Sequence, residues 1–297
     1  MPERVGEYRH TIDTGSSPPV CACVRRLAPD IEAAAKAHFD KWVAAGVARL
    51  SDSAWASPLH LVRKPDGSLR PCGDYRLVNI VTKPDRYPTR RTSDMTDELR
   101  GKRYFSKLDI LSGFNHLLMD ERDISKTAVI TPFGLYEFLR MPFGLRNAPQ
   151  TFNRFMSVVL SGLHNCHNFC DDVLIASETR DQHENDLRAL LDRLREWGIK
   201  LNTAKCEFFQ TSLEFVGFHI THDGVNPPAN RLAAISEIPL PTDSTALRRF
   251  TGMINYFHRF IPNCSSLLAP LTGLVTGGKK RETIHWTDAG RTAFYNA

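Results

Sequence analysis

The feature that most constrains this chain is a pair of adjacent aspartates inside a largely apolar stretch. Asp171 and Asp172 lie within residues 167–176, and Val173 to Ala176 follow them without interruption by a charge. Two neighbouring like charges are unfavourable in apolar surroundings unless solvent or a cation compensates them. The composition predicts a β-hairpin with the carboxylates at its turn. An acidic surface turn without further function is the alternative, because aspartate is common in tight turns.

A third aspartate favours a metal site over a surface turn. Asp109 lies in the strand-like segment 105–113, and 171 − 109 = 62 residues separate it from Asp171. Two adjacent strands would bring these carboxylates to one edge of a sheet, where hard oxygen ligands suit Mg²⁺. Such a cluster can hold two ions roughly 3.5–4 Å apart, one activating a hydroxyl and one stabilising a leaving pyrophosphate. The three residues therefore predict phosphoryl transfer, in which positioning and charge neutralisation dominate.

Length and composition indicate a soluble, globular chain. The 297 residues suffice for a sizeable core in one or two domains, and no apolar run approaches the length of a membrane span. The first residues lack the apolar run of a secretory signal, and the seven cysteines form an odd set without Cys-x-x-Cys spacing. We therefore expect reduced thiols and an intracellular protein. The net charge of +5 is compatible with a polyanionic partner or with an ordinary solvated surface.

Hydrophobic periodicity and turn residues give a coarse secondary structure. Apolar residues at helical spacing predict the helices, and Gly46 and Gly198 mark two helix ends. The predicted elements are an extended leader over 1–28, a helix over 31–43, a hairpin over 59–75, a helix over 149–163, the hairpin over 167–176, a helix over 182–197 and further helices from 229.

Six motifs follow one another in register: Trp55–Gly67, Arg70–Arg76, Phe105–Asp109, Thr131–Leu135, Arg140–Phe152 and Phe169–Ser177. Together they resemble the reverse transcriptases of gypsy-class (Metaviridae-like) LTR retrotransposon pol polyproteins. The resemblance runs from about residue 10 to residue 297. It implies an α+β right-hand polymerase fold with fingers, a palm made of an antiparallel sheet packed on helices, and a helical thumb.

The resemblance also implies a domain order. Residues 1–47 would be a leader or linker with the first helix, and residues 48–224 the fingers and palm. Residues 225–270 would form the thumb, and residues 271–297 the start of a connection toward a ribonuclease H domain that is absent here. We therefore expect the chain to be part of a larger product.

The implied activity is that of an RNA-directed DNA polymerase, which also copies DNA. It would add deoxynucleotides to a primer 3′ hydroxyl with two Mg²⁺ ions, for which Mn²⁺ can substitute. By resemblance, Asp109, Asp171 and Asp172 are the catalytic carboxylates, and the main-chain carbonyl of Ile110 assists them in binding metal.

Further residues match the nucleotide site and the primer grip of the family. Five of these residues have a structural alternative: a solvated hairpin tip for Lys64 and Arg70, the core for Phe114, and a turn leading into a helix for Phe143 and Gln150. The residues matched to nucleotide binding are Lys64, Arg70, Phe114, Phe143, Gln150 and Lys205, and those matched to the primer grip are Phe215, Val216, Gly217 and Phe218.

The implied partners are an RNA or DNA template with an annealed primer, and deoxynucleoside triphosphates. The protease, ribonuclease H and integrase of the parent polyprotein would accompany the chain, and no membrane is involved. The expected location is intracellular, in a cytoplasmic virus-like particle, with the nucleus as an alternative.

The sequence departs from the family before the paired aspartates, in the unusually polar segment 164–168, and at Phe114-Asn-His116, where Tyr-His-Gln is more usual. Phe169 and Cys170 precede the paired aspartates, where the family usually has Tyr followed by an aliphatic residue. This leaves open a degenerate polymerase fold that binds template and primer without activity. RNA-dependent RNA polymerases and nucleotide cyclases also have a palm with metal-binding carboxylates. Phe114 disfavours an RNA-dependent RNA polymerase, and the finger and primer-grip motifs disfavour a nucleotide cyclase.

Three patterns suggest other functions. Asp13-Thr-Gly15 has the triplet of aspartic proteases, but its flanks are polar, and a similar phrase occurs in the family's linker. Trp286-Thr-Asp288 resembles the entry to the ribonuclease H side without its acidic set. A zinc site is disfavoured because the spacing of its candidate ligands matches no common finger. Those candidates are His164, Cys166, His167 and Cys170.

Overall fold

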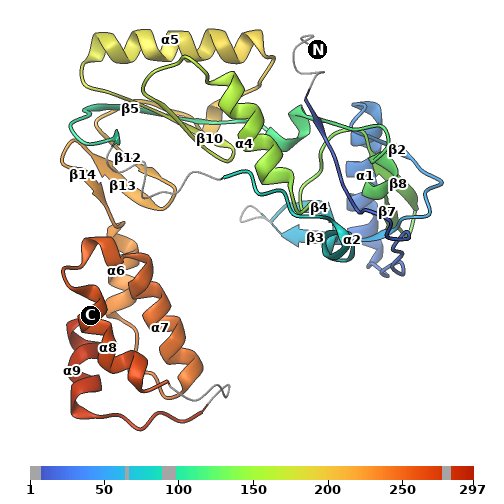
Figure 1. The fold of residues 1–297 in the computed structure, drawn as a ribbon. Helices are drawn as coiled ribbons and strands as arrows, with labels where there is room; N and C mark the ends of the chain where they lie inside the picture. Colours follow the sequence, from blue (N-terminus) through green and yellow to red (C-terminus); the bar gives the residue numbers. More distant parts are fainter. Residues whose placement is uncertain (1–7, 64–66, 89–97, 276–281) are drawn as a thin grey trace. The chain divides into compact units, whose positions relative to one another are not determined.

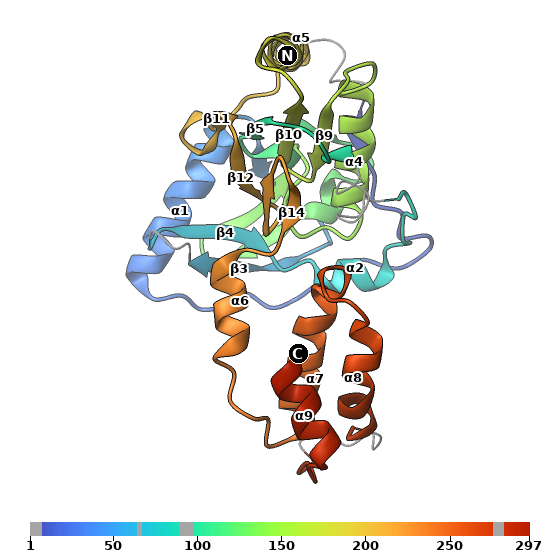
Figure 2. The same cartoon turned by 90° about the vertical axis from the view of Figure 1, so that its left-hand side faces the viewer.

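The computed structural model describes residues 8–63, 67–88, 98–275 and 282–297 (Figures 1 and 2). The chain divides into two compact units, the first comprising residues 1–98 and 102–211 and the second residues 99–101 and 212–297. Each unit has a hydrophobic core of its own. None of the described helices is long and apolar enough to cross a membrane.

The first unit contains a four-stranded antiparallel sheet in the order β11-β5-β10-β9. Strand β5 (Tyr104–Asp109) pairs with β10 (Asp172–Ser177) on one side and with β11 (Glu207–Gln210) on the other. Strand β9 (Cys166–Phe169) forms a tight hairpin with β10. The hairpin predicted around the paired aspartates is therefore confirmed.

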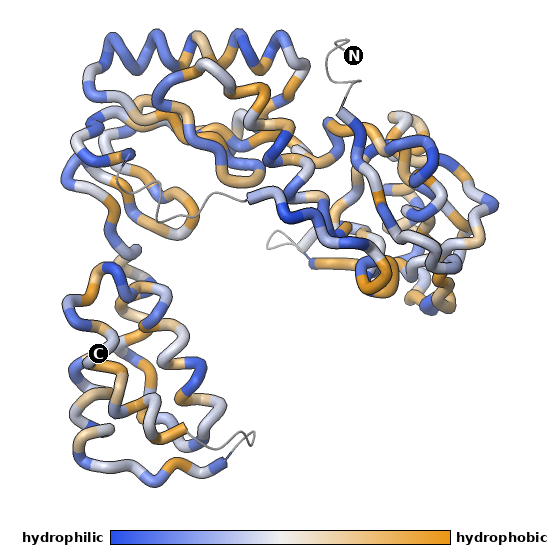
Figure 3. Tube along the Cα trace, viewed as in Figure 1, coloured by the Kyte–Doolittle hydropathy of each residue, from blue (hydrophilic) through white to orange (hydrophobic). Residues whose placement is uncertain are grey.

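Two helices pack on one face of this sheet (Figures 1 and 2). Helix α4 (Ala148–Val159) has Pro149 in its first turn, where proline costs no hydrogen bond. Helix α5 (Arg180–Glu196) starts at Thr179, whose side chain accepts a hydrogen bond from the Gln182 amide. Both predicted helices are confirmed. In Figure 3 the outer turns of α5 are hydrophilic, while its inner residues continue the apolar interior.

A second sheet of five strands lies in the same unit, in the order β2-β8-β7-β3-β4. Helix α1 (Pro29–Ala44) packs through Phe39 and Trp42, whose rings contact Tyr136 and Phe138 of β8. The predicted first helix and the predicted β3–β4 hairpin are confirmed. The strands are β2 (Ala48–Leu50), β3 (Ser57–Arg63), β4 (Leu69–Gly73), β7 (Val129–Thr131) and β8 (Gly134–Phe138).

Short elements complete the first unit. They are β1 (Arg9–His10), α2 (Arg76–Val81), η2 (Gly113–His116), β6 (Leu118–Met119), η3 (Ile124–Thr127) and η4 (Thr203–Lys205), the η elements being 3₁₀ turns.

The described part of the predicted leader lies against the first unit. Strand β1 pairs in parallel with β6, and His10 and Ile12 are buried. The Asp123 carboxylate accepts a hydrogen bond from the Ile12 amide at 2.8 Å. This segment is irregular in sequence because its few apolar residues anchor it singly, without the period of a helix or strand.

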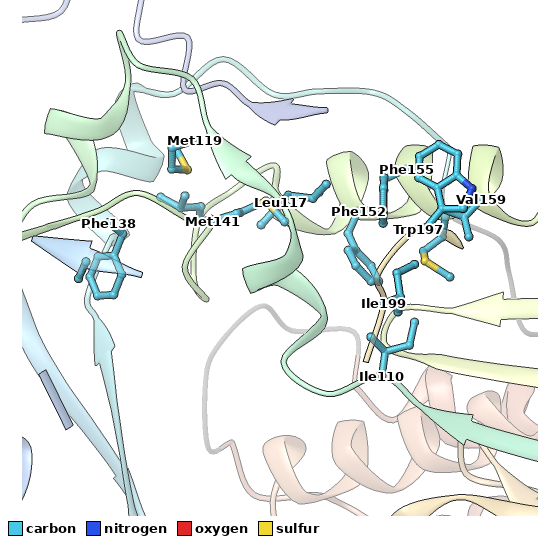
Figure 4. Close-up of a cluster of buried hydrophobic side chains, with 14 of the residues drawn as sticks. Ile110, Leu117, Met119, Phe138, Met141, Phe152, Phe155, Val159, Trp197 and Ile199 are labelled. Carbon is cyan, nitrogen blue, oxygen red and sulfur yellow. The ribbon is translucent and has the colours of Figure 1, made fainter. Parts of the chain in front are cut away.

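The core of the first unit joins α4 to the sheets. Phe152 and Phe155 on α4 are fully buried, and Phe155 packs edge-to-face on Trp197 with ring centroids 5.7 Å apart. Figure 4 shows these side chains in a row with Ile110 and Ile199 close by. Ile110 follows Asp109 directly, so the same core that stabilises the unit fixes the end of β5.

The second unit combines a three-stranded antiparallel sheet with a helical bundle. Its main segment begins at Ser212, within the range predicted for the palm, and the boundaries 47/48, 224/225 and 270/271 stay predictions. Its elements are β12 (Ser212–Phe215), β13 (Phe218–Thr221), β14 (Gly224–Asn226), α6 (Ala229–Ser236), α7 (Ser244–Tyr256), η5 (His258–Phe260), α8 (Cys264–Gly273) and α9 (Asp288–Asn296).

Candidate active site

Sheet register brings the predicted carboxylates together. Asp172, the first residue of β10, lies directly opposite Asp109, the last residue of β5. Opposed residues of an antiparallel pair point to the same face. Ser106 and Ser177 bond to His183 of α5, so the helices cover the face of positions 106 and 177. Because side chains alternate, Asp109 and Asp172 lie on the other face.

Asp171 lies in the two-residue turn of the β9–β10 hairpin. Phe169 pairs with Asp172, so only Cys170 and Asp171 connect the strands. Cys170 has a φ of 52°, in the left-handed region that residues other than glycine seldom adopt. The Asp171 carbonyl accepts a hydrogen bond from the Ile110 amide at 2.9 Å, which ties the turn to the end of β5.

The carboxylates repel one another. Burial, followed by the charges of Asp172 and Asp109, raises the pKa of Asp171 to about 6, against an opposing effect of Arg70. Burial also raises the pKa of Asp172, which Asp109 raises further and Lys107 and Lys205 lower. Oxygen Oδ1 of Asp171 is buried without a hydrogen-bond partner. This concentration of incompletely compensated negative charge suits a cation.

The donor set fits Mg²⁺ bound together with a substrate. Within the described ranges, no group of three or more His, Cys, Asp or Glu forms a ready-made metal cage. Mg²⁺ usually keeps several waters and uses one or two carboxylates plus substrate phosphates, so no such cage is needed. Asp109 and Asp171 line the same pocket as Ile110, whose main-chain carbonyl is also predicted as a ligand.

A pocket of about 490 Å³ adjoins the carboxylates and is lined by three of the six predicted nucleotide residues. Arg70 of β4, Phe143 and Lys205 line it together with Asp109 and Asp171. Nζ of Lys205 is 3.9 Å from Oδ2 of Asp109, and the Arg70 guanidinium lies over the Phe143 ring at 5.6 Å. Two cations and two carboxylates thus face one space, an arrangement able to hold a metal–polyphosphate group.

Phe114 and Gln150 are not among the residues that line this pocket, although Phe114 contacts Phe143, which does line it. The Phe114 ring packs against Phe143 at 5.1 Å and against Phe152 at 5.5 Å, so its position is fixed by two aromatic neighbours. Gln150 lies in the first turn of α4, and its Oε1 is buried without a hydrogen-bond partner. Lys64 lies outside the residues that the structure describes. The roles of all these residues stay predictions.

The predicted primer-grip residues form a turn in the second unit. Phe215 ends β12 and Phe218 starts β13, and Val216 and Gly217 between them have φ of 51° and 76°. The Phe218 ring stacks on Tyr256 at 5.6 Å, and the Arg259 guanidinium lies over the Phe218 ring at 4.5 Å from its centroid. The turn is therefore held rigidly by its own unit, and its role toward a primer stays a prediction.

The competing motifs have local structural explanations. Oδ1 of Asp13 accepts a hydrogen bond from the Gly15 amide, and its carboxylate pairs with Lys83, so this triplet is a surface turn. Cys166 and His167 are consecutive residues of β9 and therefore point to opposite faces. Burial, with the charge of Asp186, raises the pKa of the Cys166 thiol to about 12.

Sequence reasoning missed several residues around the site. His38 and Trp42 of α1 line the pocket, although their helix is distant in sequence from the carboxylates. A Cβ added to Gly73 would lie 2.4 Å from the buried ring of Tyr75, so this glycine is required for packing. A Cβ added to Gly113 would likewise collide with a neighbour, in this case the Asp171 carboxylate. A glycine in a motif is the only signal that could have indicated the last two positions.

Fold and site together define a nucleotidyltransferase-type palm, in which antiparallel strands present clustered carboxylates beside a basic pocket. Comparison with known proteins gives the class. A family model described as reverse transcriptase (RNA-dependent DNA polymerase) matches residues 62–220, and the chain belongs to this family.

Its relatives are transposon polyproteins. The chain is 36% identical over 283 residues to a retrovirus-related Pol polyprotein from transposon 297 of Drosophila melanogaster, and 31% identical over 261 residues to the transposon Tf2-3 polyprotein of Schizosaccharomyces pombe. These alignments cover 93% and 87% of the chain but only 26% and 19% of the relatives. The predicted membership of the gypsy-class reverse transcriptases is confirmed, and the chain spans about a quarter of the length of the first of these relatives.

The fold is also found in a solved structure. A foamy viral protease-reverse transcriptase in complex with double-stranded DNA matches with a TM-score of 0.88 at 24% identity, over 97% of this chain and 51% of that one. At this identity the likeness concerns the fold alone. The predicted α+β polymerase fold is confirmed.

Proposed function

We propose that this chain is an RNA-directed DNA polymerase that also copies DNA templates. The observation that carries the proposal is the pairing of Asp109 with Asp172, with Asp171 in the adjoining turn, beside a pocket lined by Arg70 and Lys205. Family membership and this geometry agree on phosphoryl transfer to a primer hydroxyl. Deoxynucleoside triphosphates and a template with an annealed primer are the proposed substrates.

The residues of the chain have distinct proposed roles. Asp109 and Asp171 would hold two Mg²⁺ ions with help from the Ile110 carbonyl, and Asp172 would contribute negative charge beside them. When bound, the ions supply activation of the primer hydroxyl and neutralise the leaving pyrophosphate. Arg70 and Lys205 would orient the triphosphate, a task for which a guanidinium fork and an ammonium point charge are suited.

Phe114 would act by exclusion. Its ring is wedged between Phe143 and Phe152, so it cannot retreat easily from a substituent that enters its space. A ring held next to the sugar of the bound nucleotide would collide with a ribose 2′-hydroxyl. This would favour deoxynucleotides over ribonucleotides.

The proposal is tested by primer extension on an RNA template with an annealed DNA primer, in Mg²⁺ and in Mn²⁺. Asp171→Asn keeps the shape of the side chain but removes its charge, and we expect incorporation to fall on the order of 100-fold or more, since a metal ligand contributes several kcal/mol to transition-state stabilisation. Asp192→Asn is the matched control, because Asp192 is an exposed residue of α5 that pairs with Arg195 across one helical turn.

A degenerate polymerase fold that only binds template and primer is the second candidate. The observation that favours it is the departure at Phe169 and Cys170, directly before the carboxylates. Salt-sensitive binding of template-primer without any incorporation by the wild-type chain would support this candidate and refute the first. Restoration of incorporation by Phe169→Tyr would identify the missing hydroxyl as the cause.

A further inference from the structure

We infer that Gly113 is a positioning residue for the catalytic carboxylate of Asp171. Because glycine has no side chain, the carboxylate can occupy the space that a Cβ would fill. This inference rests on the proposed function, since it assigns Asp171 to metal binding. It adds a role for a residue that contains no functional group.

The space beside Gly113 is occupied by the Asp171 side chain. A Cβ built on Gly113 would lie 2.5 Å from Oδ1 and 3.1 Å from Cγ of Asp171. The distance to Oδ1 is far below van der Waals contact and the distance to Cγ is tighter than ordinary contact, so the carboxylate packs directly on the glycine backbone. Oδ1 is the same oxygen that is buried without a hydrogen-bond partner. Contact with Gly113, and not a hydrogen bond, therefore defines where this oxygen lies.

The other side of Gly113 is closed by the core. The same Cβ would lie 2.9 Å from Cζ of Phe152. Phe152 is fully buried and packs against the rings of Phe114 and Phe155. In a close-packed interior such a ring can move only if its neighbours also move. The glycine is thus held between a rigid aromatic ring and the end of a short, less constrained side chain.

The difference in mobility between the Phe152 ring and the Asp171 side chain predicts which of them would move if Gly113 carried a methyl group. Gly113 does not have a positive φ, so alanine is compatible with its backbone. The methyl would push against both neighbours, and rotation of the Asp171 carboxylate costs less than displacement of the Phe152 ring. The fold should survive, and the damage should be confined to the position of Asp171. A displacement of about 1 Å at a reacting group can cost about 100-fold in rate.

A glycine-to-alanine substitution should have different effects at other glycines of the chain. A Cβ on Gly73 would lie 2.4 Å from the ring of Tyr75, which is buried in the core, so Gly73→Ala should disturb the fold and not a carboxylate. A Cβ on Gly252, in the middle of α7, would meet nothing within 4 Å. Gly252→Ala is therefore the matched control for the chemical change alone.

The test compares Gly113→Ala, Gly252→Ala and Asp171→Asn in the full chain. Binding of Mn²⁺ is measured by electron paramagnetic resonance without nucleotide or template, and primer extension, template-primer binding and thermal unfolding are measured in parallel. We expect Gly113→Ala to weaken Mn²⁺ binding about tenfold or more and extension about 100-fold, as for a residue that orients a metal ligand. Template-primer binding should stay at the wild-type level. Gly252→Ala should match wild type in Mn²⁺ binding, extension and template-primer binding, with an equal or higher melting temperature because alanine favours a helix interior over glycine.

The outcomes separate this inference from the proposed function. Wild-type Mn²⁺ binding and extension in Gly113→Ala would overturn the inference. If the wild-type chain does not extend primers, the proposed activity fails, but a loss of Mn²⁺ binding in Gly113→Ala still supports the role of Gly113. If Gly113→Ala is destabilised, Asp171→Ala is added to it: recovery of thermal stability in the double variant supports the contact, and absence of recovery overturns it.

Discussion

His10 should make the stability of the first unit depend on pH. Its side chain is 2% exposed, and Nδ1 lies 2.8 Å from the Thr151 hydroxyl. That hydroxyl donates to the Asn147 carbonyl, so it accepts a hydrogen bond from His10. Burial lowers the pKa of His10 to about 4, although the charges of Asp123 and Asp85 oppose this shift. The folded chain therefore keeps the imidazole neutral where an unfolded chain would protonate it.

The sign and size of the effect follow from linkage. The folded pKa lies below the unfolded value of about 6.5, so the unfolded chain binds more protons in acid and the contribution to stability is complete above pH 6.5. It is lost as the pH falls toward and through 4. Between pH 7 and pH 5 one such histidine lowers the free energy of unfolding by about 2 kcal/mol. For a unit of this size that corresponds to a melting temperature lower by about 4–8 °C.

The assay is thermal unfolding of wild type and His10→Gln at closely spaced pH values from 7.5 to 4.5. Carboxylates also titrate in this pH range, so the informative quantity is the difference between the pH profiles of wild type and His10→Gln. The wild type should lose more stability than His10→Gln between pH 7 and pH 5. His222→Gln is the control, because His222 is exposed beside Asp223. Parallel profiles for wild type and His10→Gln would refute the burial argument.

Two further predictions concern packing at the site. Phe114→Val should raise ribonucleotide incorporation relative to deoxynucleotide incorporation by about tenfold or more, since a lost steric contact of about 1.4 kcal/mol already changes a ratio tenfold; unchanged discrimination in single-nucleotide extension would contradict the proposed role of the ring. Gly73→Ala should destabilise the first unit by about 1–3 kcal/mol, as overpacking of a core does. The Tyr75 ring fills the space that the new methyl group would need, and its hydroxyl is held by a hydrogen bond to the Thr127 carbonyl. An unchanged melting temperature would show that Tyr75 can move.

Much of the palm was predictable because its local signals agree with its tertiary structure. The apolar strands around Asp171 and Asp172 have hairpin composition, and they form a hairpin. Helices α4 and α5 have apolar residues at helical spacing and clear termini, and both lie where the periodicity placed them. Periodicity records which face of an element is buried, so it succeeds for elements that present one face to a core.

The remainder of the site depends on contacts that periodicity does not record. His38 and Trp42 reach the pocket from α1, and only the packing of α1 on β8 brings them there. His10 lies in a segment without pattern and is buried by partners more than a hundred residues away in sequence, such as Thr151. Long-range packing of single side chains leaves no periodic trace in the sequence.

Backbone conformation gives a second kind of information that composition conceals. Among the described residues, those other than glycine with positive φ include Ser112, Cys170 and Val216. Ser112 precedes Gly113, Cys170 precedes Asp171, and Val216 lies in the predicted primer-grip turn. Propensity would favour Gly, Asn or Asp at such positions, and a β-branched residue there is a true outlier. Local preference is therefore violated where predicted functional groups must be presented, and the surrounding structure has to maintain these turns. The contact between Gly113 and Asp171 belongs to the same pattern, since it places a carboxylate by shape where no hydrogen bond does.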